Sequence, residues 1–514
     1  MDWTAGYASD IEYTAGFYAE QGPGYLNLVC ALNGCEPPSL GAPFTYCELG
    51  FGRGLTANVL AAGNPHGTFY AADFNPAHVA GARALAAEAQ LDNLTLLENS
   101  FEELAQGRVA GLPLFDYITL HGIYTWVTAE NRQHIVDFIK RYLKPGGAVY
   151  TSYNAMPGWA AMQPLQRLLV EYGDAFPNRS NIQMEGAAAF VEKLAQSSSA
   201  YIDNHPSLKG RLDTLKTGSR NYLVHEYMHK HWQPLYHADV ARDFAQAKVE
   251  FAGSAVLPMS YPLLYLTPER QAVVDAMPDA VMQETLKDYF LNTSFRKDIF
   301  VRGLRRMGPV RQAEVLARVG VALTVARGAV DLAMNTAIGT FHGKPELYNA
   351  VCDALALRPH TVGELMALPA AAGQSIANMM QVAALLAASG QALAYLGGAA
   401  RPDPAAAKRM NAALARQVRY SDEYQVLASP LTGNGLNADM VERIVFGLLF
   451  AAKGTVGGDD LTSQAWRQVS ASGRSMLRDG QRVDGEADNL AELRRRVEVV
   501  LRDRLPIWKQ LKML

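Results

Sequence analysis

The chain has 514 residues, which is too long for a single hydrophobic core, so two or three domains are expected. Hydrophobic residues make up 49% of the sequence, charged residues make up 19%, and the formal net charge is −3. This is the composition of a globular protein, and it gives no global electrostatic reason to expect nucleic acid or an anionic membrane as a partner.

The cysteines and the apolar runs indicate the cellular compartment of the protein. The sequence has no CxxC pair and no histidines at zinc-ligand spacing from its four cysteines, Cys30, Cys35, Cys47 and Cys352. This pattern predicts reduced, buried thiols. No signal-peptide pattern opens the chain, and no run approaches the roughly 18 apolar residues of a membrane span. We therefore expect a cytoplasmic protein without a membrane span.

Short apolar runs alternate with helical stretches from residue 44 to residue 153. The expected strands are Phe44–Leu49, Thr68–Ala72, Leu94–Leu97, Phe115–Leu120 and Ala148–Tyr153, and the expected helices are Leu55–Ala62, Pro76–Gln90 and Glu130–Leu143. Strands that are apolar on both faces and separated by helices predict a parallel sheet covered on two sides. Two later runs, Val249–Leu257 and Ser294–Val301, are expected to complete a seven-stranded, doubly wound, Rossmann-like α/β sheet.

The remaining segments are predicted to be mainly helical. Residues 156–235 carry helical patterns without a strand signal, which indicates an insertion into a sheet domain of residues 1–303. Three helices and a strand between Leu347 and Leu396 predict a winged-helix-like module over residues 304–400, followed by a mainly helical domain over residues 401–514. Because Ser375–Ala388 contains no Lys or Arg, we expect this module to bind protein or to form a homodimer and not to bind nucleic acid.

The most informative segment is the turn Glu48-Leu49-Gly50-Phe51-Gly52-Arg53-Gly54, between an expected strand and an expected helix. Glycines are needed where the backbone turns sharply and a ligand packs against it, and the helix start offers free N–H groups. Dinucleotide sites use a similar turn. The carboxylate of Glu48 distinguishes a dinucleotide from a ligand that carries a cationic amino group. It suits the amino group and would be badly placed beside the pyrophosphate of a dinucleotide.

Two further polar segments follow the next two strands. Asp73, followed by Phe74, ends the second strand, where an acidic side chain can accept hydrogen bonds from ribose hydroxyls. Asn99-Ser100-Phe101 follows the third strand and offers a small polar side chain to an adenine amino group. Glu48 as a surface carboxylate and Asp73 as a helix cap are alternatives for single residues. The shared position at consecutive strand ends favours one ligand site.

These features resemble class I S-adenosylmethionine-dependent methyltransferases. The resemblance is carried by the Glu-Leu-Gly-x-Gly-x-Gly run, by the strand-ending aspartate and by the Leu-Lys-Pro-Gly-Gly turn at 143–147. It implies S-adenosyl-L-methionine as the cofactor. The cofactor-binding residues are then expected to be Tyr13, Glu48, Gly50, Phe51, Gly52, Gly54, Asp73, Phe74, Asn99, Ser100, Phe101 and His121. Tyr7 and Tyr13 are candidates for a lid over the cofactor, or else for a tail without fixed structure.

A narrower resemblance covers most of the chain. It is similar to bacterial methyltransferases that carry a methyltransferase regulatory domain, of which rickettsial outer-membrane-protein lysine methyltransferases are the best known. The matching pieces include Pro23–Leu26, Leu32–Pro38, His121–Val127, Ser152–Trp159, Tyr222–Tyr227, Trp232–Pro234, Phe295–Asp298 and Ala428–Pro430. The resemblance implies a regulatory-domain-like segment at about 220–303 and an architecture like that of a protein lysine methyltransferase. It does not fix the substrate.

Candidate catalytic residues follow the fourth and fifth strands. His121 is a candidate proton acceptor, and Tyr124 and Trp126 are candidates for holding an ammonium group over their rings. Tyr153 and Asn154 are the next candidates. All but Tyr124 have an alternative role. His121 would only shape the cofactor pocket, Trp126 would pack in the core, and Tyr153-Asn154 would simply turn the chain before Pro157.

The preferred function is metal-independent transfer of a methyl group to a protein lysine. Transfer to a small molecule or to another side chain is one alternative, and a non-catalytic cofactor-binding sensor or scaffold is another. His225-Glu226-Tyr227-Met228-His229 also matches the HExxH pattern of zinc proteases. A zincin helix should run well past its second histidine, whereas Pro234 follows five residues later. We therefore expect no metal.

Overall fold

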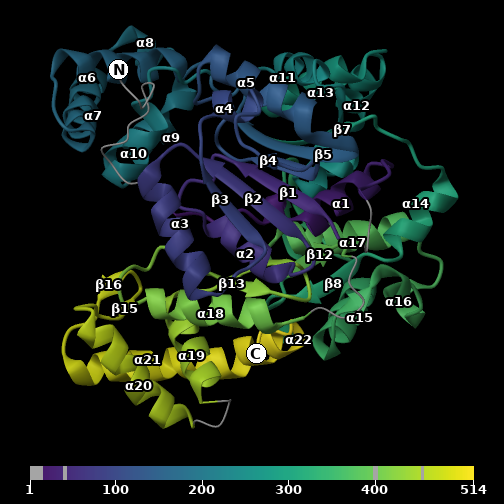
Figure 1. Cartoon of the computed structure of the whole chain (residues 1–514), viewed down its shortest axis with the longest axis vertical. Coiled ribbons are helices and arrows are strands. Elements are labelled where there is room, and N and C mark those ends of the chain that lie inside the picture. Colours follow the sequence, from purple (N-terminus) through teal and green to yellow (C-terminus); the bar gives the residue numbers. More distant parts are fainter. Residues whose placement is uncertain (1–14, 39–42, 398–402, 453–456) are drawn as a thin grey trace.

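A seven-stranded sheet forms the centre of the computed structural model, which describes residues 15–38, 43–397, 403–452 and 457–514 (Figure 1). The strand order is β3-β2-β1-β4-β5-β7-β6. The first five strands pair in parallel, and β7 pairs antiparallel with both β5 and β6. The bounds are β1 Thr45–Leu49, β2 Thr68–Asp73, β3 Leu94–Glu98, β4 Phe115–Leu120, β5 Leu143–Asn154, β6 Val249–Ser254 and β7 Phe295–Arg302. The predicted doubly wound α/β fold is confirmed.

Helices cover both faces of this sheet. Neighbouring strand residues alternate between the faces: Tyr46 belongs to a core with α1 and α2, and Cys47 belongs to a core with α4, α5 and α11. The first face is covered by α1 Pro23–Leu32, α2 Leu55–Gly63 and α3 Pro76–Glu88, and the second by α4 Phe101–Ala105, α5 Ala129–Tyr142 and α11 His237–Ala245. The strands are therefore apolar on both sides, as their sequences predict.

The order of the strands fixes where a ligand can bind. From β1 the chain proceeds through β2 and β3 to one edge, and it then returns to place β4 on the other side of β1. In such sheets a crevice forms at the carboxyl ends of the two strands where this direction reverses. The glycine-rich turn after β1 and the segment after β4 meet at this position.

Residues 156–235 form helices and short connections, as predicted. The helices are α6 Gln163–Ala175, α7 Ser180–Gln196, α8 Ala200–Asp203, α9 Lys209–Thr217 and α10 Arg220–Tyr227. They enclose a small hydrophobic core that includes Leu165, Met184 and Leu223, and Trp126 from the sheet domain packs against it. The chain then returns through α11 to β6 and β7, between which lie α12 Pro268–Asp275 and α13 Ala280–Leu291.

After β7, the next part of the chain packs against the first face of the sheet. Its helices and strands are α14 Pro309–Leu316, β8 Gly320–Leu323, β9 Ala333–Thr336, β10 Gly339–His342, α15 Pro345–Leu357, β11 His360–Thr361, α16 Val362–Met366, α17 Ile376–Ala388 and β12 Ala392–Tyr395. Three helices and a strand thus lie where the sequence predicts them. The sequence does not reveal β8, which is the central strand of the sheet β11-β8-β12. Most of the apolar side chains of α17 are buried in the core shared with α1.

The last part of the chain is mainly helical but also contains hairpins. It comprises α18 Ala405–Gln417, β13 Val426–Ser429, β14 Asn434–Asn437, α19 Met440–Ala451, α20 Gly458–Ala471, β15 Leu477–Arg478, β16 Gln481–Arg482, α21 Glu486–Val499 and α22 Leu505–Gln510. Met410 and Leu414 of α18 share a core with Val59 of α2 and Leu85 of α3. Figure 1 shows α18 alongside α2. The C-terminal part therefore supports the helix that follows the glycine-rich turn.

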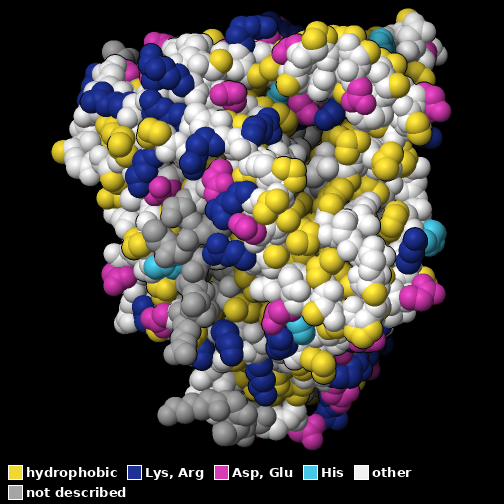
Figure 2. Space-filling view, turned by 90° about the vertical axis from the view of Figure 1, so that its right-hand side faces the viewer, with side chains coloured by type: hydrophobic (Ala, Val, Ile, Leu, Met, Phe, Trp, Pro, Cys, Tyr) yellow, Lys and Arg dark blue, Asp and Glu magenta, His cyan; other side chains and the backbone are white. Residues whose placement is uncertain are grey.

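Hydrophobic and basic side chains are unevenly distributed over the surface. Figure 2 shows hydrophobic side chains gathered over the middle of one face, with Lys and Arg side chains more numerous toward its left. Among the helices of the described residues, none combines the length and the apolar character needed to cross a membrane.

Candidate active site

A cavity of about 320 Å³ lies at the carboxyl ends of β1, β2, β3 and β4. Eleven of the twelve predicted cofactor residues line it, namely Glu48, Gly50, Phe51, Gly52, Gly54, Asp73, Phe74, Asn99, Ser100, Phe101 and His121. The twelfth, Tyr13, lies outside the described residues, as does Tyr7. Segments far apart in the sequence thus meet in one hollow because their strands end at the same edge of the sheet.

The glycine-rich turn has a backbone that other residues rarely adopt. Gly50, Gly52 and Gly54 have φ angles of 70°, 57° and 72°. A Cβ on Gly50 would lie 2.4 Å from Cδ1 of Ile123, and a Cβ on Gly54 would lie 2.5 Å from Cβ of Ala82. Glycine is therefore required here both by the backbone conformation and by the close neighbours.

Glu48 is a buried carboxylate with only one partner among the described residues. Its side chain is 3% exposed, and its Oε1 accepts a hydrogen bond of 3.3 Å from Nε2 of Gln21. Its Oε2 has no hydrogen-bond partner among the described residues. Burial, with a smaller effect of nearby Asp73, raises the pKa of Glu48 to about 8. Glu48 is thus not a surface carboxylate, and a cationic ligand group would satisfy it.

Asp73 holds the glycine-rich turn from the end of β2. Its Oδ2 accepts a 2.8 Å hydrogen bond from the backbone N–H of Gly52, and its Oδ1 accepts one of 2.9 Å from that of Asn75. Nδ1 of His78 lies 3.3 Å from Oδ1. The side chain that caps α3 is Asn75, which accepts a hydrogen bond from Ala77. Asp73 therefore fixes the loop around the cavity.

The segment after β3 forms the start of α4. Ser100 and Glu103 form a reciprocal capping box at this helix. Asn99 donates a 3.4 Å hydrogen bond from Nδ2 to Oε2 of Glu103, and it lines the cavity. The capping contacts therefore hold Asn99 and Ser100 at the rim.

An N-terminal segment, residues 15–22, covers part of the cavity and was not predicted from the sequence. Gly16 and Tyr18 line the cavity, and the ring of Tyr18 stacks on His121 with 3.6 Å between centroids. Glu20 forms an ion pair with Lys297 of β7, and Gln21 contacts Glu48. No periodic pattern marks this segment; it directly precedes the Pro23–Leu26 motif.

His121 follows β4 and is held by aromatic neighbours. Its Nδ1 lies 2.8 Å from the hydroxyl of Tyr150, and its ring is stacked on Tyr18. Burial, together with nearby Lys297, lowers the pKa of His121 to about 3. The imidazole is therefore neutral at physiological pH and a weak base, which favours the alternative that it shapes the pocket.

Trp126 lies where the cavity meets the helical insertion. The side chain is half-buried, and its ring centroid lies 5.2 Å from that of His229 and 6.1 Å from that of Trp232. The same cavity is also lined by Tyr222, His225, Glu226 and His229. The sequence indicated these residues only as part of a family pattern and of an HExxH match.

Tyr124, Tyr153 and Asn154 lie outside the cavity lining, unlike the prediction. The hydroxyl of Tyr124 donates a 2.9 Å hydrogen bond to Asp243 of α11, and that of Tyr153 donates one of 2.6 Å to Asp298. Asn154 is engaged through its backbone with Thr125 and Leu235. Side chains alternate along a strand, so Tyr153 points into the core beneath α5 and α11.

The HExxH match does not form the helix of a zinc protease. Helix α10 ends at Tyr227, so His229 lies beyond it. The ring centroids of His225 and His229 are 6.1 Å apart. Among the described residues, no group of three His, Cys, Asp or Glu side chains is placed to hold a metal ion.

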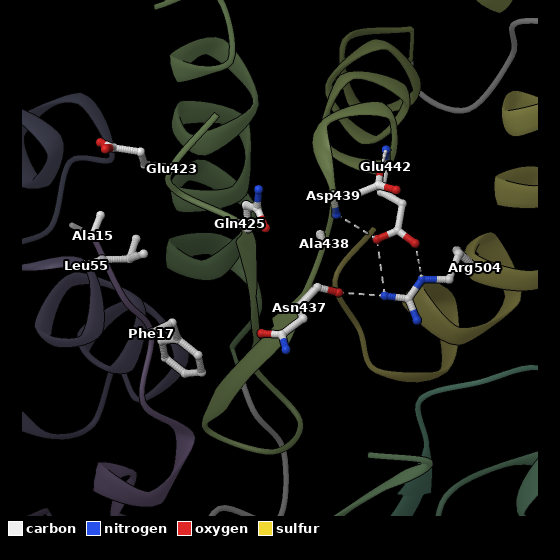
Figure 3. Close-up of a pocket in the computed structure, with 10 residues that line it drawn as sticks. All are labelled: Ala15, Phe17, Leu55, Glu423, Gln425, Asn437, Ala438, Asp439, Glu442 and Arg504. Carbon is white, nitrogen blue, oxygen red and sulfur yellow. Dashed lines mark hydrogen bonds and ion pairs between the residues drawn. The ribbon is translucent and has the colours of Figure 1, made fainter. Parts of the chain in front are cut away.

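A second cavity, of about 500 Å³, lies between the N-terminal segment, the start of α2 and the C-terminal part (Figure 3). Arg504 pairs with Glu442 at 2.8 Å and donates a 2.7 Å hydrogen bond to the backbone carbonyl of Asn437. Glu423, which also lines this cavity, forms an ion pair with Arg53 of the glycine-rich turn. The C-terminal part therefore contacts the turn directly.

Comparisons with known proteins agree with this geometry. A methyltransferase domain family matches residues 42–201, and a predicted methyltransferase regulatory domain matches residues 219–302. The chain is 36% identical to the uncharacterized protein sll1526 of Synechocystis sp. over 512 residues, which cover 99% of each protein.

Two solved structures share the fold along nearly the whole chain. PKMT2 from Rickettsia typhi in complex with AdoHcy superposes with a TM-score of 0.70 at 16% identity, covering 98% of this chain and 99% of that one. The structure of PKMT2 from Rickettsia typhi has a TM-score of 0.68 with the same identity and coverage. The C-terminal part is thus included in the shared fold.

The residues of the first cavity fit S-adenosylmethionine. Oε2 of Glu48, which has no partner among the described residues, suits the amino group of the methionine part, and the glycine-rich turn leaves room for a ligand against its backbone. The fit of the cavity to this cofactor, the two family matches and the relative that covers 99% of the chain together identify the family of the protein. The chain belongs to the class I S-adenosylmethionine-dependent methyltransferases that carry a methyltransferase regulatory domain.

Proposed function

We propose that this methyltransferase acts on lysine side chains of a protein. One observation carries the proposal: the cavity that begins at Glu48 and the glycine-rich turn continues to the indole of Trp126 and the carboxylate of Glu226. An aromatic face and a carboxylate are the two groups that recognise an organic cation. A lysine ammonium has this chemistry.

Each end of the cavity has its own task in this proposal. S-adenosylmethionine, when bound, supplies a methyl group on a sulfonium sulfur. A neutral amine can attack the methyl carbon and displace the sulfur. Glu48 holds the amino group of the cofactor, and Asp73 holds the turn and receives the ribose hydroxyls. Tyr18, in the N-terminal segment, covers the site beside His121 and limits the entry of water.

The acceptor must be positioned and must lose a proton. A free lysine has a pKa of about 10.4, so its amine is mostly protonated at neutral pH. Enclosure beside Trp126 removes water and favours the neutral amine. Correct alignment of the amine with the methyl group is worth about 7–11 kcal/mol in such displacements. No metal is required for this reaction.

Both the sequence motifs and the fold support a protein lysine as the acceptor. The motifs resemble those of rickettsial lysine methyltransferases, and the fold matches PKMT2 over 98% of the chain. The helical insertion carries one wall of the cavity, at Tyr222 and Glu226. Because Tyr222 is 43% exposed, this wall reaches the surface, where a protein side chain can enter.

The experiment is a labelling assay with full-length protein and methyl-tritiated S-adenosylmethionine. A cell lysate is the acceptor, and its proteins and small molecules are separated before counting. We expect the label in protein and, after acid hydrolysis, in methylated lysines. Label in small molecules or in other amino acids would contradict lysine as the acceptor, and cofactor binding without any transfer would favour a scaffold or sensor.

A further inference from the structure

Glu226 lines the cavity and has no hydrogen-bond or ion-pair partner among the described residues. It lies near the end of α10. A carboxylate that is largely enclosed is costly unless it meets a cation or a hydrogen-bond donor. The cavity in front of Glu226 therefore suits a cationic group of a ligand.

Among the described residues, a single cation acts on the charge of Glu226. This cation is Arg211 of α9, whose guanidinium lies 4.2 Å from the ring centroid of Trp159. Burial raises the pKa of Glu226 to about 7, and Arg211 only partly opposes this effect. The other titratable side chains of the same wall are Tyr222, His225 and His229. Glu226 can thus both bind a cation and exchange a proton near neutral pH.

The aromatic groups beside Glu226 complete a cation site. Trp126 and Tyr222 line the same cavity, and Trp126 follows β4, on the side of the cavity where the sheet domain contributes His121 and Ile123. Asp73 is engaged with the glycine-rich turn, so two further acids of the cavity, Glu48 and Glu226, are available for the amino groups of the cofactor and of the acceptor. The HExxH-like sequence is then explained without a metal.

We propose that Glu226 binds the ammonium group of the acceptor lysine, against Trp126, and takes one of its protons. This inference rests on the proposed function for the identity of the amine. In the step, one Nζ–H bond breaks, the proton passes to a carboxylate oxygen of Glu226, and the electron pair stays on nitrogen as the lone pair needed for methyl transfer. Glu226 later returns the proton to water.

The test compares Glu226→Gln with Glu185→Gln in the full-length chain. The first change removes the charge and keeps the size, and the second is a matched control because Glu185 is an exposed residue of α7 outside the cavity. The proteins are saturated with S-adenosylhomocysteine at pH 8, and binding of N-acetyl-lysine amide is measured by nuclear magnetic resonance. We expect at least about 10-fold weaker binding for Glu226→Gln and no change for the control.

Methyl transfer gives a second readout. At pH 7.5 we expect Glu226→Gln to lower kcat/KM at least about 100-fold, the typical worth of a general base. The difference in kcat/KM between wild type and Glu226→Gln should narrow toward pH 10, where lysine loses its proton in water. Calorimetry with S-adenosylhomocysteine should give the same affinity for all three proteins, because Glu48 and the glycine-rich turn hold the cofactor in the proposed function, whereas Glu226 belongs to the helical insertion.

The outcomes separate this inference from the proposed function. Equal binding of the lysine probe to wild type and Glu226→Gln, including no binding to either, overturns the role of Glu226. A ratio of kcat/KM between wild type and Glu226→Gln that stays constant from pH 7.5 to pH 10 overturns it as well. Label found only in another amine, with Glu226→Gln defective toward that amine, contradicts the proposed function but supports Glu226 as the base.

Discussion

Arg53 in the glycine-rich turn forms an ion pair with Glu423, which lies 370 residues later in the chain. The Arg53 guanidinium also lies 5.5 Å from the ring centroid of Tyr424. Since α18 packs against α2 as well, the C-terminal part supports both the turn and the helix that follows it. A region distant in sequence therefore contributes to the shape of the cofactor site.

The contact between Arg53 and Glu423 predicts a modest effect on cofactor binding. We expect Glu423→Gln to weaken S-adenosylhomocysteine about 2- to 5-fold, because Glu423 is 42% exposed and such pairs are worth up to about 1 kcal/mol. Calorimetry measures the affinity. Glu498→Gln, at an exposed position on α21, is the control. Identical affinities for both variants and wild type would show that the contact does not shape the turn.

Glu48 predicts a cofactor affinity that depends on pH. A cation binds the ionised carboxylate, and with a pKa of about 8 the acid is mostly protonated at pH 7. Affinity for S-adenosylhomocysteine should therefore rise about 5-fold from pH 7 to pH 8, a range in which the amino group of the ligand keeps its proton. Glu48→Gln should bind more weakly and lose this dependence. A wild-type affinity that is flat over this range would argue against contact between Glu48 and the amino group.

The buried group around Asp298 predicts a large effect on stability. Its Oδ2 accepts hydrogen bonds from Arg296 at 2.8 Å and from Tyr153 at 2.6 Å, and it lies 3.1 Å from Nδ1 of His237. Asp298→Asn leaves Arg296 without part of its countercharge, so we expect a loss of about 3–5 kcal/mol in urea unfolding. Asp213→Asn, at an exposed position on α9, should change stability little.

The same group predicts how stability responds to acid. Asp298 is fully buried, and Arg296 and His237 together outweigh the opposing effect of burial and lower its pKa from 3.8 to about 2. A lowered carboxyl pKa stabilises the fold fully above about pH 4, and this contribution is lost as the pH falls toward 2. The difference in unfolding free energy between wild type and Asp298→Asn should shrink over that range. A constant difference down to pH 2 would contradict the assignment.

Tyr153 is expected to matter for stability and not for methyl transfer. Its hydroxyl is bound to Asp298 in the core and does not line the cavity. Tyr153→Phe should lose about 1–3 kcal/mol of stability and keep kcat/KM within about 3-fold at a temperature where the variant is folded. A fall of 100-fold in kcat/KM without unfolding would return Tyr153 to the candidate catalytic residues.

The cofactor side of the site could be predicted because it is local in the sequence. Glu48 and Asp73 lie in the last two residues of their strands and Asn99 directly follows the next strand, and parallel strands end at one edge of the sheet. Periodicity alone was therefore enough to bring them together. Tyr153 was expected in the site by the same logic, but its strand position turns the side chain toward the core face.

The acceptor side could not be predicted in this way. Trp126 and Glu226 are 100 positions apart and line the same cavity only because the helical insertion packs beside the strand ends. No local pattern encodes that packing. The short strands of the C-terminal half were missed for a related reason: β13 and β14 have four residues each and carry Ser429, Asn434 and Gly435, which indicate loops.

The most direct measurement is a crystal structure of the full-length protein with S-adenosylhomocysteine. We predict that the amino group of the ligand lies within hydrogen-bond distance of Glu48 and that the ligand's sulfur faces the part of the cavity lined by Trp126 and Glu226. A ligand bound elsewhere, or a sulfur enclosed with no open path to these two residues, would contradict this prediction.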